Sequence, residues 1–321
     1  MKLTEFQKIL LLAIVFLCLN YITMMLYQKL SELQVKEGFQ DKETENSLAE
    51  WITEPAKIYD AMYAKVYDQL TQGVKRTQGK VDLALSTWIT KSRPAKEQTV
   101  LDAGCGTGIT AIALAKQDIG RVIALDQSQA FLDYMKDTVI PQSTLTDEQK
   151  QSLVIRKDTL MNPSACNPSE VDHIVCYYFT IYYLEDKETF FRNCYLWTKD
   201  GGTLFVEVVN KNKFDPVLES ANPLVGFSIQ KYFKDRLRTS RVMFNEFEYE
   251  AEFKLLDPKA EFFETFRFKT NKVRRQKHIL YMEDIKQITQ IATTVGWTYT
   301  GYQDLTSLGF EYAYVLMFKK A

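Results

Sequence analysis

The sequence has few of the residues that build metal sites and disulfide frameworks. Its 321 residues include only two histidines and five cysteines, and no two cysteines form a Cys-x-x-Cys pair. A zinc site needs several such ligands at close spacing, so no metal site is predicted. Usable N-glycosylation signals are also missing, since every Asn-x-Ser/Thr triplet has proline in the middle. Both absences favour a reducing, unglycosylated compartment.

The sequence also lacks an excess of charge of either sign. It has 40 Lys and Arg against 41 Asp and Glu, which gives a formal net charge of −1. A nucleic-acid-binding domain usually carries a basic excess, so no nucleic-acid partner is predicted. The apolar share of 46% is that of an ordinary globular protein, and a packed core is expected.

One long apolar run lies near the N-terminus. Residues 9–27 contain no charged side chain and lie between Lys8 and Lys29. As a helix, this run would be about 28 Å long, close to the ~30 Å hydrocarbon core of a bilayer. No small-residue cleavage site follows it, which disfavours a signal peptide. We expect residues 1–30 to be a membrane anchor and residues 31–49 to be a polar tether; a signal peptide or a buried helix is the alternative.

The orientation of this anchor does not follow from its flanking charges. Lys2 and Lys8 before the run balance Lys29 and Lys36 after it. The cysteines favour a reducing environment. We therefore expect a single-pass membrane protein whose large domain, residues 50–321, faces the cytosol.

The large domain alternates between predicted strands and helices. Strands are predicted at 99–103, 121–126, 152–158, 171–178, 201–209, 298–305 and 311–319, and helices at 108–117, 128–140, 187–199 and 282–295. Nearly continuous apolar strands separated by helices are typical of a parallel sheet covered on both faces. The last two strands are joined by a short loop and must be antiparallel. The pattern predicts an α/β fold: a Rossmann-like, doubly wound, seven-stranded, mostly parallel sheet with an antiparallel edge strand.

About 70 residues separate the fifth strand from the last helix, and a connection of that length needs its own structure. Residues 243–253 alternate strictly between apolar and polar, and return strands are predicted at 261–269 and 272–282. We expect an antiparallel β insertion at about 211–280. The glutamates of its polar face, Glu246, Glu248, Glu250 and Glu252, would pair with Arg267, Lys269 or Arg274.

A glycine-rich loop follows the first predicted strand and opens a helix. Residues 102–108 read Asp-Ala-Gly-Cys-Gly-Thr-Gly. Glycines allow a tight turn and let a ligand approach the backbone closely. The dinucleotide fingerprint would place its third glycine at Ile109, which disfavours an NAD-dependent oxidoreductase. Asp126 ends the next strand, where an acid can accept hydrogen bonds from both ribose hydroxyls.

These residues carry a family resemblance. The stretch VLDAGCGTG, with VIALD downstream, resembles the class I S-adenosylmethionine-dependent methyltransferases, and most of all their small-molecule branch. The resemblance covers about residues 55–210 and 280–319. It implies that the loop lies under the methionine part of S-adenosylmethionine, that Asp126 binds its ribose and that Asp158 approaches its adenine. The cofactor-binding positions it implies are Asp102, Ala103, Gly104, Cys105, Gly106, Gly108, Asp126, Gln127, Ser128, Asp158, Thr159 and Tyr177.

No general base is evident from the sequence. Relatives that carry a histidine just after the fourth strand differ from this chain, which has Tyr182 and Tyr183 there. The catalytic candidates are Tyr177, Tyr178 and Tyr183. Because the sulfonium is already activated, alignment of the reactants supplies much of the rate. His173 is expected to be structural, and the role of His278 is open.

Three tyrosines precede the glycine loop at a spacing of four. Tyr59, Tyr63 and Tyr67 are expected on one face of a helix, either as part of the core or as an aromatic wall that closes a ligand pocket. Together these features favour a membrane-anchored methyltransferase for a small-molecule or lipid acceptor. The alternative is a catalytically silent, membrane-tethered binding module of the same fold.

Overall fold

The computed structural model describes residues 14, 20–21, 50–71, 73–90, 92–214 and 239–321. The chain divides into two compact units, Met1–Glu50 and Trp51–Ala321. The predicted anchor and tether therefore lie almost entirely outside the described residues and stay predictions. Among the helices in the described ranges, none is long and apolar enough to cross a membrane.

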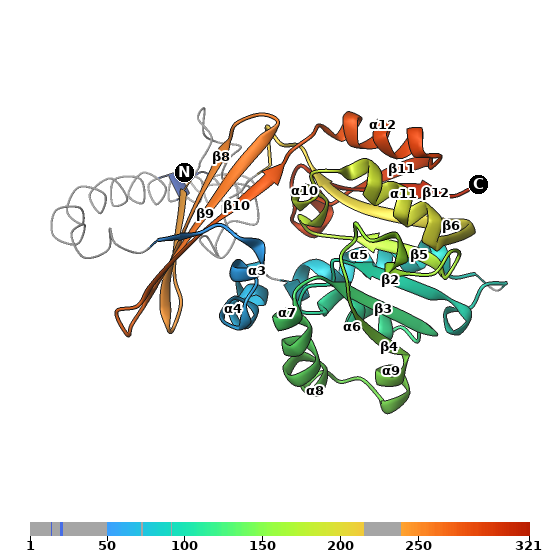
Figure 1. Ribbon diagram of the computed structural model, residues 1–321, viewed down its shortest axis with the longest axis horizontal. Helices are drawn as coiled ribbons and strands as arrows, with labels where there is room; N and C mark the ends of the chain where they lie inside the picture. The colour runs from blue at the N-terminus through green and yellow to red at the C-terminus, as the bar shows by residue number, and fades with distance from the viewer. Residues whose placement is uncertain (1–13, 15–19, 22–49, 72, 91, 215–238) are drawn as a thin grey trace, which may run out of the picture. The chain divides into compact units, whose positions relative to one another are not determined.

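A seven-stranded sheet forms the core of the second unit, in the order β11-β12-β6-β5-β2-β3-β4 (Figure 1). Its strands are β2 (Thr99–Ala103), β3 (Arg121–Asp126), β4 (Leu153–Lys157), β5 (Val171–Cys176), β6 (Thr198–Val209), β11 (Thr298–Asp304) and β12 (Ala313–Lys319). Every residue of the central strand β5 is buried, as expected for a strand covered on both faces. The predicted Rossmann-like, mostly parallel sheet is confirmed.

One detail of the predicted sheet is wrong. The antiparallel strand is β12, which lies between β6 and β11 and runs antiparallel to both, so it is not the edge strand. The edge strand β11 follows helix α12 (Ile285–Val295) and runs in the same direction as β6. The short connection from β11 turns the chain back, so that the apolar strand β12 lies between β11 and β6 and is paired along both of its edges.

Helices cover both faces of this sheet. They are α3 (Pro55–Ile58), α4 (Ala61–Thr71), α5 (Gly73–Trp88), α6 (Ile109–Ala115), α7 (Gln129–Tyr134), α8 (Ile140–Gln142), α9 (Asp147–Ser152), α10 (Thr180–Tyr183) and α11 (Lys187–Trp197), besides α12. From β2 the chain winds outward through β3 to β4, and from β5 it winds the opposite way to β6. Right-handed crossovers place the helices of the two halves on opposite faces.

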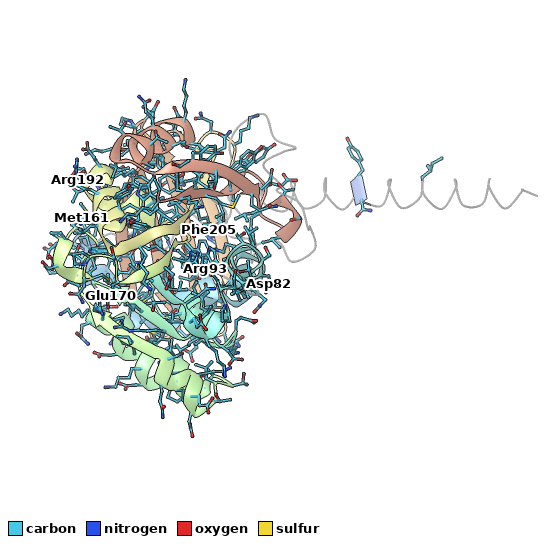
Figure 2. The ribbon with its side chains drawn as sticks, turned by 90° about the vertical axis from the view of Figure 1, so that its right-hand side faces the viewer. Asp82, Arg93, Met161, Glu170, Arg192 and Phe205 are labelled. Atoms are coloured by element: carbon cyan, nitrogen blue, oxygen red, sulfur yellow. The ribbon has the colours of Figure 1, made fainter. Side chains whose placement is uncertain are left out.

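The interior of the sheet and the surface of its helices differ clearly in side-chain type. Figure 2 shows Phe205 within β6, while Arg192 and Asp82 lie on the outside of their helices. Phe205 is buried, and both charged residues are exposed. Burial of such large apolar side chains is the main stabilising contribution to the fold.

A second, five-stranded sheet has the order β1-β10-β9-β8-β7. Its strands are β1 (Trp51–Ile52), β7 (Thr239–Met243), β8 (Phe247–Leu255), β9 (Lys259–Phe268) and β10 (Val273–Tyr281). Strands β7–β10 are antiparallel, and β1 joins β10 in parallel from the N-terminal end of the domain. Figure 1 shows this sheet beside α3 and α4, apart from the central sheet.

The predicted strand at 243–253 is broken in the structure. Residues 244–246 form a tight turn between β7 and β8, so Glu246 is not part of the glutamate face. This turn contains neither glycine nor proline, which is why alternation alone did not reveal it. Of the predicted partners, Arg267 does pair with Glu250 at 2.8 Å.

Arg274 has a different partner from the one predicted. Its guanidinium binds Asp60 at 2.6 Å and also donates to the backbone carbonyl of Ile58 at 2.8 Å. Asp60 in turn accepts hydrogen bonds from the first backbone N–H groups of α4, which begins at Ala61. Tyr59 therefore lies just before this helix and not on it, contrary to the predicted common face. Arg274 ties the second sheet to this junction.

Candidate active site

The site lies where the order of the central sheet reverses, beyond the carboxyl ends of β2 and β5. Ligands of open α/β sheets bind in this crevice. The loop after β2 takes left-handed backbone conformations at Gly104 (φ +77°), Gly106 (φ +54°) and Gly108 (φ +84°), which explains the need for glycine there. The loop after β5 brings Tyr177, Tyr178 and Thr180 to the same place.

The three glycines have different surroundings. A Cβ at Gly104 would lie 2.5 Å from Thr180 Cγ2, and one at Gly108 would lie 2.3 Å from Met135 Sδ. A Cβ at Gly106 would meet nothing closer than 3.8 Å. Gly104 and Gly108 are therefore needed for packing within the protein. Gly106 faces open space that a ligand would use.

Asp126 fixes the glycine loop from the neighbouring strand. Its Oδ2 accepts the backbone N–H of Gly106 at 2.9 Å, and its Oδ1 accepts that of Ser128 at 2.8 Å. Burial raises the pKa of this carboxyl, while the hydrogen bonds from Ser128 and Gly106 oppose the shift. Each carboxylate oxygen still has a lone pair for a ligand hydroxyl on the cavity side.

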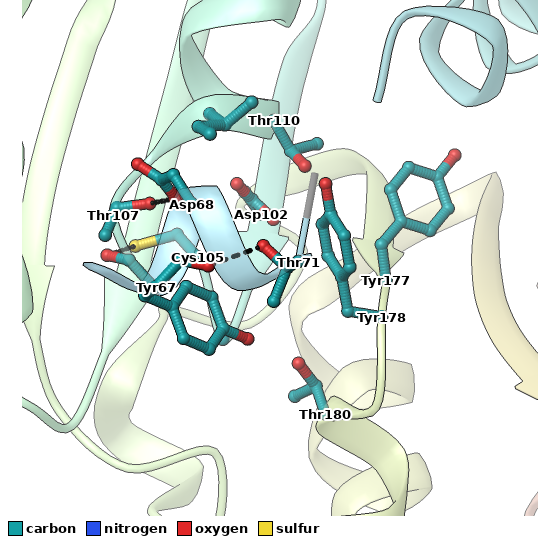
Figure 3. A pocket seen from close by; sticks show the side chains of 13 residues that line it. Tyr67, Asp68, Thr71, Asp102, Cys105, Thr107, Thr110, Tyr177, Tyr178 and Thr180 are labelled. Atoms are coloured by element: carbon teal, nitrogen blue, oxygen red, sulfur yellow. Dashed lines mark hydrogen bonds between the residues drawn. The ribbon is translucent and has the colours of Figure 1, made fainter. Parts of the chain in front are cut away.

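A small cavity of ≈ 30 Å³ lies under the loop (Figure 3). Figure 3 shows Asp102 between Asp68 and Tyr178. In the described part of the chain, Asp102 Oδ2 has no hydrogen-bond partner, although the residue is only 2% exposed. Burial raises the pKa of Asp102 to about 7 and that of Asp68 to about 6, the latter against a hydrogen bond from Thr107.

This cavity fits the cationic end of a ligand. Three carboxyl groups surround the loop, the buried Asp102 and the half-buried Asp68 and Asp126, and desolvation raises the pKa of each. A bound ammonium or sulfonium group would favour their ionised forms and pair with the free oxygen of Asp102. The residues present therefore suit the amino-acid end of S-adenosylmethionine.

A larger cavity of ≈ 370 Å³ adjoins the loop. Such a volume falls in the range of small-molecule sites. One part is lined by loop and strand-end residues: Gly104, Gly106, Asp126, Gln127, Asp158 and Thr159. The other part is lined mainly by apolar and aromatic residues, and we call it the acceptor chamber: Ile58, Tyr59, Tyr67, Phe179, Tyr183 and His278.

The aromatic side chains of the chamber pack edge to face. The ring of Tyr59 lies 5.4 Å from that of Phe131 and 5.9 Å from that of Tyr183, and Tyr67 lies 5.2 Å from Phe131. Both interpretations of the tyrosine series hold in part. Tyr59 and Tyr67 line the chamber, whereas Tyr63 is buried and donates to Glu264 at 2.8 Å.

The structure brings most of the predicted cofactor residues to the two cavities. Those that line a cavity are Asp102, Gly104, Cys105, Gly106, Asp126, Gln127, Asp158, Thr159 and Tyr177. Ala103, Gly108 and Ser128 line neither; Ser128 caps α7 and donates to the carbonyl of Tyr59 at 2.7 Å. The side chain of Asp158 is bound by Asn162 at 3.0 and 3.1 Å, within its own loop.

The catalytic candidates divide into two groups. Tyr177 donates to the carbonyl of Lys80 at 3.3 Å, and the backbone N–H of Tyr178 binds Glu207 at 2.7 Å, so both fix the end of β5. Only Tyr183 lines the acceptor chamber. Its hydroxyl lies 3.1 Å from Nδ1 of His278.

Two residues of the site, Asp68 and Glu264, were missed in the sequence, and His278 was named there with its role left open. Asp68 carries no motif, and His278 and Glu264 come from the β insertion, far from the glycine loop. Glu264 was not assigned to any face, because it lies on the predicted return strand at 261–269 and outside the strictly alternating stretch at 243–253. The only available signal was that His278 is one of two histidines in the chain.

The comparison with known protein families agrees with this geometry. Residues 100–202 match the family model described as a methyltransferase domain. This part of the chain is similar to a methyltransferase domain. The match supports the predicted enzyme class and, with it, the predicted cofactor S-adenosylmethionine; the matched range contains β2–β5 and the glycine loop.

Relatives of the methyltransferase domain cover only part of the chain. It is 35% identical over 79 residues to a cypemycin N-terminal methyltransferase of Streptomyces sp., which is 25% of this chain and 30% of that protein. It is 30% identical over 118 residues to a ubiquinone biosynthesis O-methyltransferase of Coxiella burnetii, which is 36% of this chain and 46% of that protein. The chain thus spans less than half the length of these curated relatives.

A solved structure extends the likeness beyond the matched segment. The crystal structure of an S-adenosylmethionine-dependent methyltransferase from Clostridium acetobutylicum ATCC 824 has a TM-score of 0.59 and 16% sequence identity. The likeness covers 81% of this chain and 98% of that one. At this identity the comparison shows the fold alone.

Proposed function

We propose that the whole chain transfers a methyl group from S-adenosylmethionine to a small-molecule acceptor held in the acceptor chamber. The observation that carries this proposal is the continuity of one cavity, which joins Gly106 and Asp126 to the acceptor chamber. A cofactor bound at the loop and an acceptor bound in the chamber would meet within this single cavity. The names of the partial relatives, an O-methyltransferase and an N-terminal methyltransferase, support the reaction type.

The chain's residues would bind and orient the reactants. S-adenosylmethionine supplies an activated methyl group on a sulfonium. Asp102 and Asp68 would hold its charged end, and Asp126 its ribose hydroxyls. Tyr59, Tyr67 and Phe131 would exclude water and hold the acceptor in line with the methyl group, which is worth several kcal/mol in a displacement.

Transfer of labelled methyl from S-adenosylmethionine to a small-molecule extract, catalysed by the full chain, tests this function. A labelled product is expected in the low-molecular-weight fraction. Binding of S-adenosylmethionine without transfer to any acceptor would favour the silent binding module instead.

Asp126→Ala is expected to weaken binding of S-adenosylmethionine by about 10–150-fold, or about 1.5–3 kcal/mol, because charge-assisted hydrogen bonds to the ribose are lost. Isothermal titration calorimetry on the full chain measures this. Asp133→Ala, an exposed change on α7, serves as the matched control and should bind normally. Equal affinities for the two variants would contradict the ribose role of Asp126.

We also propose that residues 9–27 anchor the enzyme to a membrane, with the catalytic domain in the cytosol, and that the acceptor is in or beside that membrane. The charge-free run supports this. Confinement raises the effective concentration only for acceptors that share the membrane.

Deletion of residues 1–30 should then leave the affinity for S-adenosylmethionine unchanged. Methylation of acceptor in vesicles should fall by about tenfold or more, in line with ordinary effective-concentration gains. Labelled turnover by the full and shortened chains on the same vesicles provides the comparison. Equal rates would show that the acceptor is a soluble compound.

A further inference from the structure

A buried carboxylate lies behind the acceptor chamber at the centre of a hydrogen-bond cluster. Glu264, on β9, is 1% exposed. Its Oε2 lies 2.6 Å from Nε2 of His278, 2.6 Å from the amide of Gln276 and 2.8 Å from the hydroxyl of Tyr63. Its Oε1 accepts the hydroxyl of Tyr249 at 2.6 Å. Because donors surround both of its oxygens, this carboxyl group acts only as a hydrogen-bond acceptor.

The charge state of Glu264 follows from these contacts. Burial alone would raise its pKa, but the hydrogen bonds from His278, Tyr249 and Gln276 hold the pKa below its ordinary value. Glu264 is therefore ionised at neutral pH and cannot donate. Since it approaches Nε2 of His278 at 2.6 Å, that nitrogen must carry the hydrogen.

The other nitrogen of His278 is then the basic one. In the neutral ring, a hydrogen on Nε2 leaves a lone pair on Nδ1. Tyr183 lies 3.1 Å from Nδ1, and burial raises the pKa of its phenol well above the ordinary value, so the phenol keeps its hydrogen and donates it. His278 is 2% exposed, whereas Tyr183 is only partly buried, and both residues line the chamber.

We propose that Tyr183, His278 and Glu264 form a proton relay that removes the hydrogen from a hydroxyl acceptor, so that the chain is an O-methyltransferase of small, uncharged hydroxyl compounds. This rests on the proposed methyl transfer in the same cavity. Tyr183 is the catalytic residue that touches the acceptor. His278 receives the proton, and Glu264 is a positioning residue that fixes its tautomer.

The step balances without another reactant. The acceptor oxygen forms a bond to the methyl carbon as the carbon–sulfur bond breaks, and its electron pair stays on sulfur, which becomes a neutral thioether. The acceptor O–H bond breaks, and its proton goes to the oxygen of Tyr183. The phenolic proton of Tyr183 passes to Nδ1 of His278. The resulting imidazolium is paired with the carboxylate of Glu264.

The cluster favours a hydroxyl over an amine for a chemical reason. A phenol or alcohol holds its proton at neutral pH, with a reference pKa of about 10 for a phenol, and attacks well only when that proton is removed. A neutral amine attacks through its free lone pair and needs no base beforehand. The chamber offers this base among aromatic rings, and Lys277, which also reaches the cavity, is paired with Glu261 at 3.1 Å.

Nuclear magnetic resonance tests the relay directly, because the full chain contains only two histidines. With nitrogen-15-labelled histidine at pH 8, His278 should show hydrogen on Nε2 and a bare Nδ1, and Tyr183→Phe should shift the Nδ1 signal alone. His278→Gln assigns the signals. Hydrogen on Nδ1, a doubly protonated ring, or an Nδ1 signal unchanged in Tyr183→Phe would overturn the relay.

Kinetics with defined probes test the acceptor class. Catechol and benzyl alcohol serve as hydroxyl probes, and aniline and benzylamine as amine probes, with labelled S-adenosylmethionine. Transfer is expected to the hydroxyl probes, with kcat lowered about 100-fold or more in Tyr183→Phe and in His278→Gln and an unchanged KM for S-adenosylmethionine. The rise of kcat with pH that reports the neutral base should disappear in His278→Gln.

Matched controls separate the relay from a structural effect. Tyr182→Phe changes the adjacent tyrosine, whose hydroxyl binds the backbone of Val209, and His173→Gln changes the histidine stacked on Trp88. Both should keep kcat and its pH profile. The other titratable groups around His278 are Tyr59 and Tyr63. Neither ionises near neutral pH, because burial raises the pKa of each.

Two outcomes would overturn the hydroxyl assignment while the proposed function stands. These are transfer to the amines alone, or transfer to no hydroxyl probe by a chain that binds S-adenosylmethionine and methylates an extract. An unchanged pH profile in His278→Gln would overturn the relay. Failure of the unaltered chain to bind S-adenosylmethionine in calorimetry would instead count against the proposed function.

Discussion

Gly106→Val is expected to abolish detectable binding of S-adenosylmethionine, with a loss of more than about 100-fold, or ~2.7 kcal/mol. Gly106 has a φ of +54°, which a β-branched residue disfavours. Its Cβ would project into the space beside Phe131 and Tyr67, at ordinary contact distances of 3.8 and 3.9 Å. The new side chain would therefore occupy ligand space. Calorimetry with S-adenosylmethionine measures the loss, and circular dichroism measures the fold.

A matched glycine separates the blocked site from backbone strain. Gly201 also has a left-handed φ of +75°, with nothing within 4 Å of its Cβ, and it lies at the start of β6 away from both cavities. Gly201→Val should lose similar stability, of the order of 1 kcal/mol, and keep its affinity. If folded Gly106→Val binds as tightly as Gly201→Val, the loop is not the cofactor site.

Asp102→Asn is expected to stabilise the free protein while weakening its cofactor binding. Burial raises the pKa of Asp102 to about 7, against ~3.9 in an unfolded chain. Between these values the folded state holds more protons than the unfolded state, so the free energy of unfolding falls as pH rises from about 4 to about 7 and stays lower above that. Asparagine has no charge, so it avoids the loss in free energy of unfolding that comes from burying an ionised carboxylate, up to ~4 kcal/mol at pH 8.

The same substitution is expected to weaken cofactor binding. The ionised Asp102 would pair with the cofactor's ammonium group, so Asp102→Asn should bind S-adenosylmethionine about 10–150-fold more weakly at pH 8. In the unaltered chain the affinity should fall by up to about tenfold per pH unit below about 7, as Asp102 takes up a proton. Asp68, whose pKa is raised to about 6, adds a second decline at lower pH.

Thermal unfolding at pH 8 and pH 4 and calorimetry between pH 8 and pH 5.5 check both halves of this prediction. Asp68→Asn is the matched control, which should keep the decline near pH 7 and lose the one near pH 6. A melting temperature and an affinity at pH 8 that are both unchanged in Asp102→Asn would show that Asp102 does not face the cofactor.

The sequence by itself determined the central sheet and the cofactor loop. Each parallel strand is a short apolar run, and some of the helices have a local start signal, such as Ser128 before α7. The turn after β2 must be glycine because its backbone conformation is left-handed. These features depend on residues close together in the chain, so they can be predicted from the sequence alone. The position of β12 could not be predicted from the sequence, since the order of strands in a sheet depends on tertiary packing.

The tertiary structure alone decided the chemistry of the acceptor chamber. Tyr183 and His278 are 95 positions apart, and Tyr63 and Glu264 are 201 positions apart, yet each pair is joined by a hydrogen bond. Asp68 reaches Thr107 of the glycine loop from a helix that precedes it. No local pattern encodes such contacts. They arise because the second sheet packs against α4 through buried aromatic side chains, and that packing brings His278 to the cavity and Glu264 behind it.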